Sequence, residues 1–233
     1  MADNILAEAR AGYGKIGDET ALTREAFYWD ELKRFVDYVR EGESVLDVGC
    51  GNGRAYELFK SKNVNYAGVD VSPAMIDNAR KFWQTPQTVF EVGDLMNLPV
   101  PDDRYDIVIA TGVLQHIPSL AYRHQAMREL ARATRPGGYV LMADWNLWLP
   151  RYWRMHLHQR FGRKNGWDKG DLRLSWKTTG FPHYYHAFVK NELFALAAGA
   201  GLNVMEHYYA KKGEISTWFK GENLVTVCQK PKK

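Results

Sequence analysis

A short apolar run that closes on a glycine-rich turn constrains the fold of this chain more than any other feature. Residues 44–49 read SVLDVG, which is typical of a buried parallel strand, and residues 50–54 read CGNGR. Glycines just past such a strand permit a tight turn and a close approach of the backbone to a ligand. Asp70 follows Gly49 by 21 positions, where a carboxylate can accept hydrogen bonds from both hydroxyls of a ribose. The pattern predicts a site for a nucleoside-containing cofactor at the carboxyl ends of the strands.

Apolar runs alternate with amphipathic stretches along the rest of the chain. Ser72 followed by Pro73 marks the start of one helix, as N-cap and first helical residue. After the strand at 44–49, further strands are expected at 65–70, 88–94, 105–111, 138–145, 202–209 and 223–230. This alternation predicts a doubly wound α/β fold, with a mostly parallel seven-stranded sheet covered by helices on both faces.

The chain length of 233 residues fits one domain with one elaborated insertion. Residues 146–189 lose the periodicity and are rich in Trp, Arg, Gly and Lys, so we expect them to form a substrate lid. The expected organisation is a helical cap at 1–42, a cofactor-binding core at 43–145, the insertion at 146–189, and a final helix with strands at 190–233.

Composition excludes several classes of protein. The only two cysteines, Cys50 and Cys228, rule out a disulfide scaffold and fit a reducing compartment. The N-terminus has no signal-peptide pattern, and no run approaches the ~18 apolar residues of a membrane-spanning helix. A cytoplasmic protein without a membrane partner is therefore expected. No metal is expected either, because the paired histidines lack acidic or cysteine partners at ligand spacing.

The glycine turn departs from the dinucleotide fingerprint. That fingerprint requires a third glycine at position 54, where this chain has Arg54, which we expect to start a helix in solvent. Asp47, just before the turn, would repel a pyrophosphate but would attract a cationic amino-acid tail. The turn therefore suits S-adenosylmethionine (SAM) better than NAD.

These motifs resemble those of the class I SAM-dependent methyltransferases, and the resemblance extends from Ser44 to Trp145. FEVGDL at 90–95 is similar to the family's adenine-binding segment, DIVIATGVLQH at 106–116 to its fourth-strand segment, and RPGG at 135–138 to the turn before its fifth strand. The resemblance implies a Rossmann-like fold, SAM as cofactor and S-adenosylhomocysteine as product. It also implies a set of cofactor-binding residues, namely Asp47, Gly49, Cys50, Gly51, Asp70, Val71, Ser72, Gly93, Asp94, Leu95, Thr111 and Gly112.

A second resemblance lies in the C-terminal third. HYYHAF at 183–188 followed by KNEL at 190–193 is similar to a stretch of the tRNA wobble-uridine carboxymethyl methyltransferases, and Tyr13 and Arg24 lie in a similar N-terminal element. Those enzymes esterify the carboxylate of 5-carboxymethyluridine, and eukaryotic members work with a small activator subunit. The resemblance implies catalytic roles for His116 and Arg24. It implies acceptor contacts for Tyr13, Trp145, Arg151, His183, Tyr184, Tyr185 and His186.

The acceptor remains open between two classes of molecule. Between residues 146 and 177 there are eight Lys or Arg and only two Asp, and the basic residues are interleaved with tryptophans. Proteins that bind single-stranded RNA loops use this combination. A carboxylate acceptor needs no general base, so transfer would rest on in-line positioning alone. However, His183 and Gln115 replace an arginine and a histidine of the tRNA enzymes. A small-molecule O- or N-methyltransferase with an aromatic lid is the alternative, as is a SAM-binding module without activity.

Overall fold

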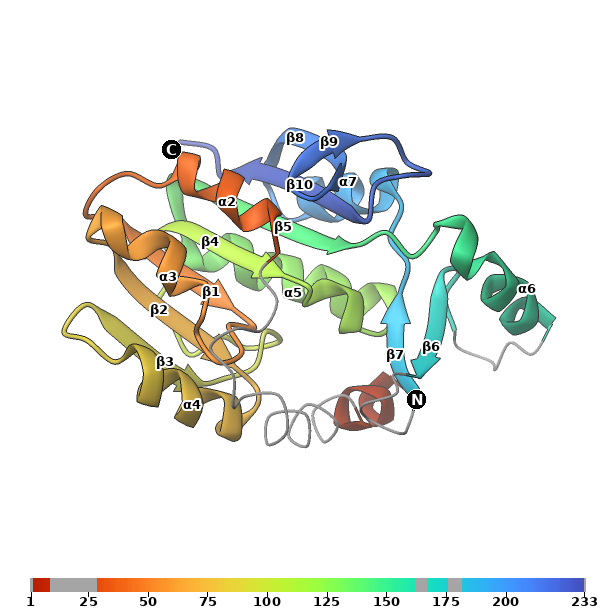
Figure 1. The fold of residues 1–233 in the computed structure, drawn as a ribbon, viewed down its shortest axis with the longest axis horizontal. Helices are drawn as coiled ribbons and strands as arrows, with labels where there is room; N and C mark the ends of the chain where they lie inside the picture. Colours follow the sequence, from red (N-terminus) through yellow and green to blue (C-terminus); the bar gives the residue numbers. More distant parts are fainter. Residues whose placement is uncertain (1, 9–28, 162–166, 176–181, 233) are drawn as a thin grey trace.

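A computed structural model describes residues 2–8, 29–161, 167–175 and 182–232 of the chain (Figure 1). Its centre is an eight-stranded sheet in the order β3-β2-β1-β4-β5-β10-β8-β9. The first five strands pair in parallel, and the last three run antiparallel to their neighbours. The strands are β1 (Ser44–Val48), β2 (Asn65–Asp70), β3 (Thr88–Val92), β4 (Tyr105–Thr111), β5 (Thr134–Trp145), β8 (Asn203–Lys211), β9 (Glu214–Ser216) and β10 (Asn223–Gln229). The predicted doubly wound α/β fold is confirmed.

The sheet has one strand more than the sequence predicted. Lys212 and Gly213 both have positive φ angles, 52° and 78°, and turn the chain back on itself. The three residues of β9 then pair with the end of β8, at the outer edge of the sheet. A second difference is that β5 begins at Thr134, so the RPGG segment lies inside the strand, where the register with β4 shifts.

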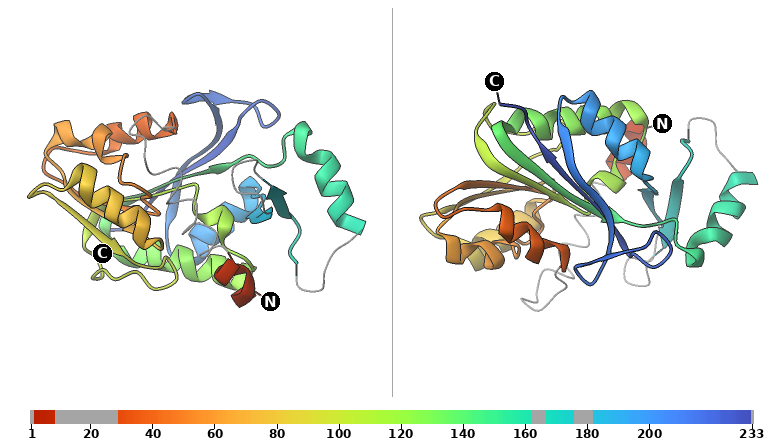
Figure 2. Two further views of the ribbon diagram at one scale, coloured as in Figure 1. Left: turned by 60° about the horizontal axis from the view of Figure 1, so that its bottom comes forward. Right: turned by 90° about the horizontal axis from the view of Figure 1, so that it is seen from above.

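Helices cover both faces of the sheet, as Figure 2 shows. One face carries α2 (Glu31–Phe35), the 3-10 helix η1 (Val36–Tyr38), α3 (Tyr56–Phe59), η2 (Lys60–Lys62) and α4 (Pro73–Trp83). The other face carries α5 (Leu120–Ala133) and α7 (Lys190–Gly199). The sheet between them separates two apolar cores, and β1 is buried along its whole length because it lies at the centre.

The start of α4 follows the sequence signal closely. Ser72 is the N-cap, and its Oγ accepts a hydrogen bond from the amide of Met75 at 3.4 Å. Pro73 is the first helical residue, where its missing N–H costs no hydrogen bond. The helix therefore begins directly behind the carboxyl end of β2.

The segment predicted as an insertion forms a small unit beyond the carboxyl end of β5. It contains η4 (Pro150–Tyr152), α6 (Trp153–Phe161) and a hairpin of β6 (Asp171–Ser175) and β7 (Pro182–His186). A separate apolar cluster holds it together, with Leu147, Leu172, Leu174, Tyr185 and Ala187 as its buried members. The hairpin stands beside the carboxyl ends of β4 and β5 (Figure 1).

The helix at residues 2–8 lies next to this hairpin (Figure 1). Glu8 forms an ion pair with Arg173 of β6 at 2.6 Å, and Tyr122 of α5 donates a hydrogen bond to Asp3. The chain's first described residues therefore lie beside the insertion, near the carboxyl ends of the strands. Among all the described residues, no helix is both long enough and apolar enough to cross a membrane.

Candidate active site

A cavity opens at the carboxyl ends of β1, β2 and β4. It collects nine of the twelve residues that the sequence assigned to the cofactor, although these come from four separate segments of the chain. They are Gly49, Gly51, Asp70, Val71, Gly93, Asp94, Leu95, Thr111 and Gly112. Leu6 of the N-terminal helix, Met75 and Ile117 add apolar wall, so the cavity has a polar floor and apolar sides.

The glycine turn at the floor of the cavity requires glycine at Gly49. Its φ angle is 72°, in the left-handed region, and its amide donates a hydrogen bond to the carbonyl of Val69 at 2.7 Å. A Cβ atom added at this position would lie 2.2 Å from Cγ2 of Val113. Both the backbone angle and the close approach of the segment after β4 therefore exclude any larger residue.

Asp70 fixes the turn from the end of β2. Its Oδ2 accepts a hydrogen bond from the amide of Gly51 and its Oδ1 one from the amide of Ser72, both at 2.9 Å. Burial raises the pKa of this carboxyl, although the backbone amides oppose the rise. The carboxylate also lines the cavity, where its remaining lone pairs can accept ribose hydroxyls. Ser72 itself is buried beneath the cavity as the N-cap of α4.

A second hollow shares Gly49, Gly51 and Thr111 with the first. Asp47 and Arg54 both line it, together with Cys50 and Trp29. Burial raises the pKa of Asp47 to about 6, and the hydroxyl of Tyr66 donates a hydrogen bond to it at 2.5 Å. A carboxylate and a guanidinium in one hollow suit a zwitterion, such as the amino-acid end of SAM. The sequence predicted that Arg54 starts a helix in solvent, but α3 begins at Tyr56 and Arg54 lines this hollow.

Thr111 supplies a further sign that this hollow accepts a polar ligand. Its Oγ1 is buried and has no hydrogen-bond partner among the described residues. Buried hydroxyls are almost always hydrogen-bonded, so such a group at a cavity wall points to a ligand or water. Thr111 lines both hollows and therefore lies where the two ends of an extended cofactor would join.

His116 also lines the cavity and is the last residue of the 3-10 helix η3 (Leu114–His116). Its Nδ1 lies 3.3 Å from the carbonyl oxygen of Tyr184, and its ring contacts that of Tyr185 at 4.6 Å between centroids. Burial lowers the pKa of His116 to about 4. The ring is therefore neutral at physiological pH and is a poor general base.

An aromatic wall continues from His116. The ring of Tyr185 stacks on Trp145 at 5.5 Å between centroids, and Trp145 stacks on Trp29 at 6.2 Å. Trp29 was not predicted, because nothing in its local sequence marks it as part of a site. These four residues, His116, Tyr185, Trp145 and Trp29, are called the aromatic wall below.

Gln115 supports this wall. Its side-chain Oε1 accepts a hydrogen bond from the backbone amide of Trp145 at 2.7 Å, and its backbone amide donates one to Oδ1 of Asp144 at 3.1 Å. Asp144 is fully buried, and burial raises its pKa to about 7. Gln115, which differs from the residue found in the tRNA enzymes, thus links η3 to the end of β5.

The four residues at 183–186 divide between the two faces of β7. Tyr185 belongs to the aromatic wall, and His183, two positions away, has a pKa that burial lowers. Tyr184 and His186 point to the other face, where both bond to Asp171 of β6 at 2.6 Å. The sequence grouped all four as acceptor contacts, whereas the structure places the polar atoms of Tyr184 and His186 within a buried charged cluster.

Of the remaining predicted residues, the one that the structure describes, Arg151, lies apart from the cavity. Arg151 is exposed on η4, with its guanidinium over the ring of Tyr152. Tyr13 and Arg24 fall outside the described residues. No group of three or more His, Cys, Asp or Glu side chains suited to a metal ion occurs in the described ranges.

Comparison with known proteins gives the class of chemistry. Residues 46–142 match the methyltransferase domain family. A protein of Encephalitozoon cuniculi named as a candidate methyltransferase is 28% identical over 198 residues, covering 84% of this chain and 87% of that protein. The 27-O-demethylrifamycin SV methyltransferase of Amycolatopsis mediterranei is 34% identical, covering 58% of this chain and 51% of that enzyme. An Arabidopsis thaliana tRNA (carboxymethyluridine(34)-5-O)-methyltransferase is 32% identical, covering 57% and 31%. The chain thus spans about half or less of the two relatives whose names state a substrate.

Solved structures show the same fold. A SAM-dependent methyltransferase from Methanosarcina mazei superposes with a TM-score of 0.70 at 21% identity, covering 86% of this chain and 98% of that one. The complex of the Haloferax volcanii Trm112 methyltransferase activator with a candidate methyltransferase gives a TM-score of 0.63 at 24% identity, covering 87% and 90%. The glycine turn, the acids at the strand ends and these likenesses lead to one conclusion: the chain is a SAM-dependent methyltransferase with the class I fold.

Proposed function

We propose that the chain methylates the carboxylate of a carboxymethyl wobble uridine in tRNA. Among the described residues that line the cavity, the titratable side chains are Asp70 and Asp94, which the proposal assigns to the cofactor, and His116. The observation that carries the proposal is the state of His116. Its pKa of about 4 leaves no base there to deprotonate a hydroxyl or phenol. A carboxylate is already ionised at neutral pH and needs none.

Bound SAM would supply the methyl group as a sulfonium, and the protein's residues would align the two partners. In the proposal Asp70 holds the ribose, Asp94 and Leu95 the adenine, and Asp47 and Arg54 the two charges of the amino-acid end. His116 lines the same cavity and would lie on the acceptor side. Holding the nucleophile near attack distance in this way can supply most of the rate of an in-line transfer.

The aromatic wall suits a flat acceptor. Unpaired bases of RNA loops are recognised by stacking on aromatic side chains. Trp145 and Tyr185 stack on each other beside His116; Tyr185 is only 4% exposed, so the half-buried Trp145 is the one of the two that a base could reach. Relatives named as tRNA (carboxymethyluridine(34)-5-O)-methyltransferases occur in Arabidopsis thaliana and in Mus musculus, the latter 28% identical over 169 residues.

The insertion offers a contact for the RNA backbone. The side chains of Arg151, Trp153 and Arg154 are exposed together on η4 and the first turn of α6. Arginines meet phosphates while a tryptophan face stacks on a base, and this pairing is common in proteins that bind single-stranded RNA. Arg151 therefore belongs to the acceptor in this proposal, through the RNA chain rather than the methylated base.

The test is transfer of labelled methyl from SAM into total tRNA and, separately, into a small-metabolite extract. We expect label in tRNA that is released by mild alkali, as a methyl ester is. Arg151→Ala with Arg154→Ala should weaken tRNA binding and reduce the slope of log affinity against log salt by about 1.4, or about 0.7 for each lost phosphate contact. The control, Arg40→Ala with Arg128→Ala, removes one exposed arginine before β1 and one on α5. It should change neither the affinity for tRNA nor its salt dependence.

A small-molecule acceptor is the second candidate. It is favoured by the 34% identity to the 27-O-demethylrifamycin SV methyltransferase. It is also favoured by Trp148, whose ring stacks on that of His156 within the insertion, at 4.1 Å between centroids. Label found only among metabolites would support it and would overturn the tRNA proposal. The pH profile separates the chemistry as well: a carboxylate acceptor gives a rate that does not rise with pH above about pH 6, whereas a phenol gives a rate that rises with pH.

A small activator subunit is the partner that fits this proposal. The Haloferax volcanii structure pairs a chain of the same fold with the Trm112 activator. Strand β3 forms an open edge of the sheet here, and its Val89 and Val92 are 53% and 48% exposed. Open edges that carry apolar side chains are sites for strand addition by a partner. Co-elution with such an activator on size exclusion would support this partner, and Val89→Asp should abolish it.

A further inference from the structure

A cluster of charged side chains is buried behind β7, on the face away from the aromatic wall. His186 lies at its centre with a side chain that is 1% exposed. Its Nδ1 is 2.6 Å from Oδ1 of Asp171, and its Nε2 is 2.9 Å from both carboxylate oxygens of Glu192. Arg123, 2% exposed, lies 3.2 Å from Glu192 and 2.6 Å from Asp168. This set, with Tyr184, is called the buried ion cluster.

The geometry fixes the protonation of His186. A carboxylate only accepts hydrogen bonds, so each ring nitrogen that faces one must carry a hydrogen. Both nitrogens of His186 face carboxylates, and an imidazole with two N–H groups is a cation. Burial and the charge of Arg123 oppose that charge, but the hydrogen bonds that His186 donates to Asp171 and Glu192 outweigh them and raise the pKa of His186.

Charge balance leads to the same state. The cluster contains three carboxylates, of Asp168, Asp171 and Glu192, and one guanidinium, of Arg123. A neutral His186 would leave two negative charges uncompensated in a largely buried site, and protonation reduces this to one. Asp144 of β5 is also buried and lies close enough for the positive charge of His186 to oppose the rise of its pKa that burial causes. Buried charges that lack partners are strongly unfavourable, so the cation is needed.

The cluster joins four elements around the acceptor site. Asp171 comes from β6, His186 and Tyr184 from β7, Arg123 from α5 and Glu192 from α7. The hydroxyl of Tyr184 donates to Asp171 at 2.6 Å, while its backbone carbonyl accepts from Nδ1 of His116. Tyr185, the next residue, projects from the opposite face of β7 into the aromatic wall. Any loosening of the cluster therefore reaches both His116 and Tyr185.

We propose that His186 is a positioning residue, held as an imidazolium between Asp171 and Glu192, that fixes the β6–β7 hairpin and so sets the acceptor wall. It acts through Tyr184 and Tyr185 and does not itself touch the acceptor. The proposal rests on the methyltransferase activity, but it does not depend on whether the acceptor is tRNA.

The position of the pKa gives the direction of the pH effect. The folded-state pKa of His186 lies above its unfolded value of about 6.5, so the stabilisation is fully present below about pH 6.5. It is lost as the pH rises through the folded-state pKa. The hairpin should therefore loosen at alkaline pH, whereas the sheet around the cofactor should not.

The first experiment is an NMR measurement of histidine side-chain nitrogens on the intact wild-type chain with SAM. We expect both nitrogens of His186 to be protonated at pH 7 and those of His116 to show a neutral ring. A neutral, singly protonated His186 at pH 7 would overturn the proposal. This measurement uses no acceptor and no variant, so neither a wrong acceptor nor a misfolded protein can affect it.

The second experiment compares hydrogen exchange in the wild type, His186→Gln and the control His207→Gln. Glutamine at 186 keeps a hydrogen bond but removes the charge, so we expect residues 171–175 and 183–186 to exchange roughly tenfold faster or more. SAM affinity should stay within about twofold, because His186 does not line the cofactor cavity. His207 is a partly buried histidine of β8 that forms a hydrogen bond with Thr226. Burial lowers the pKa of His207 to about 4. Its replacement should leave the hairpin unchanged.

The pH series completes the test. After correction for intrinsic exchange, the wild-type hairpin should open more at pH 9 than at pH 6, and the His186→Gln hairpin should show no such difference. Equal protection in the wild type at both pH values, or faster exchange spread over the whole sheet in the variant, would contradict a positioning role. Failure of tRNA labelling with these results intact would overturn only the proposed acceptor.

Discussion

Replacing Asp70 by alanine is expected to weaken SAM binding by about 100-fold or more. The carboxylate accepts two backbone hydrogen bonds, from Gly51 and Ser72, and faces the cavity where the ribose would lie. Hydrogen bonds to a charged group each contribute about 1.5–3 kcal/mol, and 1.4 kcal/mol is a factor of ten in affinity. The variant loses the ribose acceptor and the anchor of the glycine turn together. Isothermal titration with SAM measures the change.

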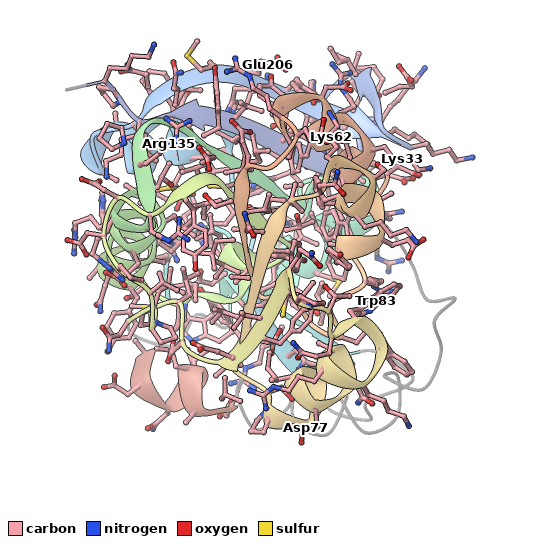
Figure 3. All side chains as sticks on the ribbon, turned by 90° about the vertical axis from the view of Figure 1, so that its left-hand side faces the viewer. Lys33, Lys62, Asp77, Trp83, Arg135 and Glu206 are labelled. Atoms are coloured by element: carbon pink, nitrogen blue, oxygen red, sulfur yellow. The ribbon has the colours of Figure 1, made fainter. Side chains whose placement is uncertain are left out.

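Two further variants separate these contributions. Asp77→Ala removes an acid from the same stretch of chain, but its side chain is 76% exposed on α4 and points into solvent (Figure 3). This control should bind SAM like the wild type. Asp70→Asn keeps one acceptor oxygen and should fall between the two. Binding by Asp70→Ala within about threefold of the wild type would remove Asp70 from the cofactor site.

The strands were predictable from the sequence where they are buried and central. β2 and β4 occupy the predicted ranges, because each is an apolar run bounded by polar residues or turns. The edge was not predictable in the same way. β9 is only three residues long and exists because β8 offers an unpaired edge beside a tight turn. A strand of that kind depends on its neighbour more than on its own sequence.

The cofactor cavity could be predicted because its residues follow a topological rule. Ligands of open parallel sheets bind at the carboxyl ends of the strands, and each strand end is visible in the sequence. Trp29 and Arg54 could not be found this way. Trp29 contacts Trp145, more than a hundred positions along the chain, and no local pattern encodes that contact. Arg54 lines the second hollow together with Asp47, two residues before α3 begins at Tyr56, and no local pattern distinguishes it from a solvent-exposed arginine.

The run at 183–186 did carry a usable signal. Alternate residues of a strand point to opposite faces, so two of the four side chains had to lie away from the acceptor. The resemblance to the tRNA enzymes gave all four one role, whereas the period of two assigns Tyr184 and His186 to the face of Asp171. What the sequence could not supply was the partner on that face, Glu192 on α7, which approaches only in the folded chain.

Gly49→Ala is expected to lower both the melting temperature and the affinity for SAM. An alanine at φ 72° costs about 1–2 kcal/mol, and its Cβ would lie 2.2 Å from Cγ2 of Val113. Val113 must move, and it lies between Thr111 and His116 in the wall of the cavity. With about 3 kcal/mol lost in total, the melting temperature should fall by roughly 6–12 °C in a chain of this size. SAM affinity should fall about tenfold or more.

The chain offers a control that separates backbone strain from the clash. Gly42 has a φ of 76°, and a Cβ there would meet nothing within 4 Å, so Gly42→Ala isolates the strain. In a Val113→Ala background the nearest side-chain atom to the Cβ of Gly49→Ala is Cβ of residue 113 at 3.4 Å, an ordinary contact. The substitution at 49 should then cost only as much as Gly42→Ala, because strain alone remains. If Gly49→Ala costs no more than Gly42→Ala even with Val113 present, the turn does not depend on this close approach. In that case the fit between the glycine turn and the segment after β4 is not what shapes the cofactor cavity.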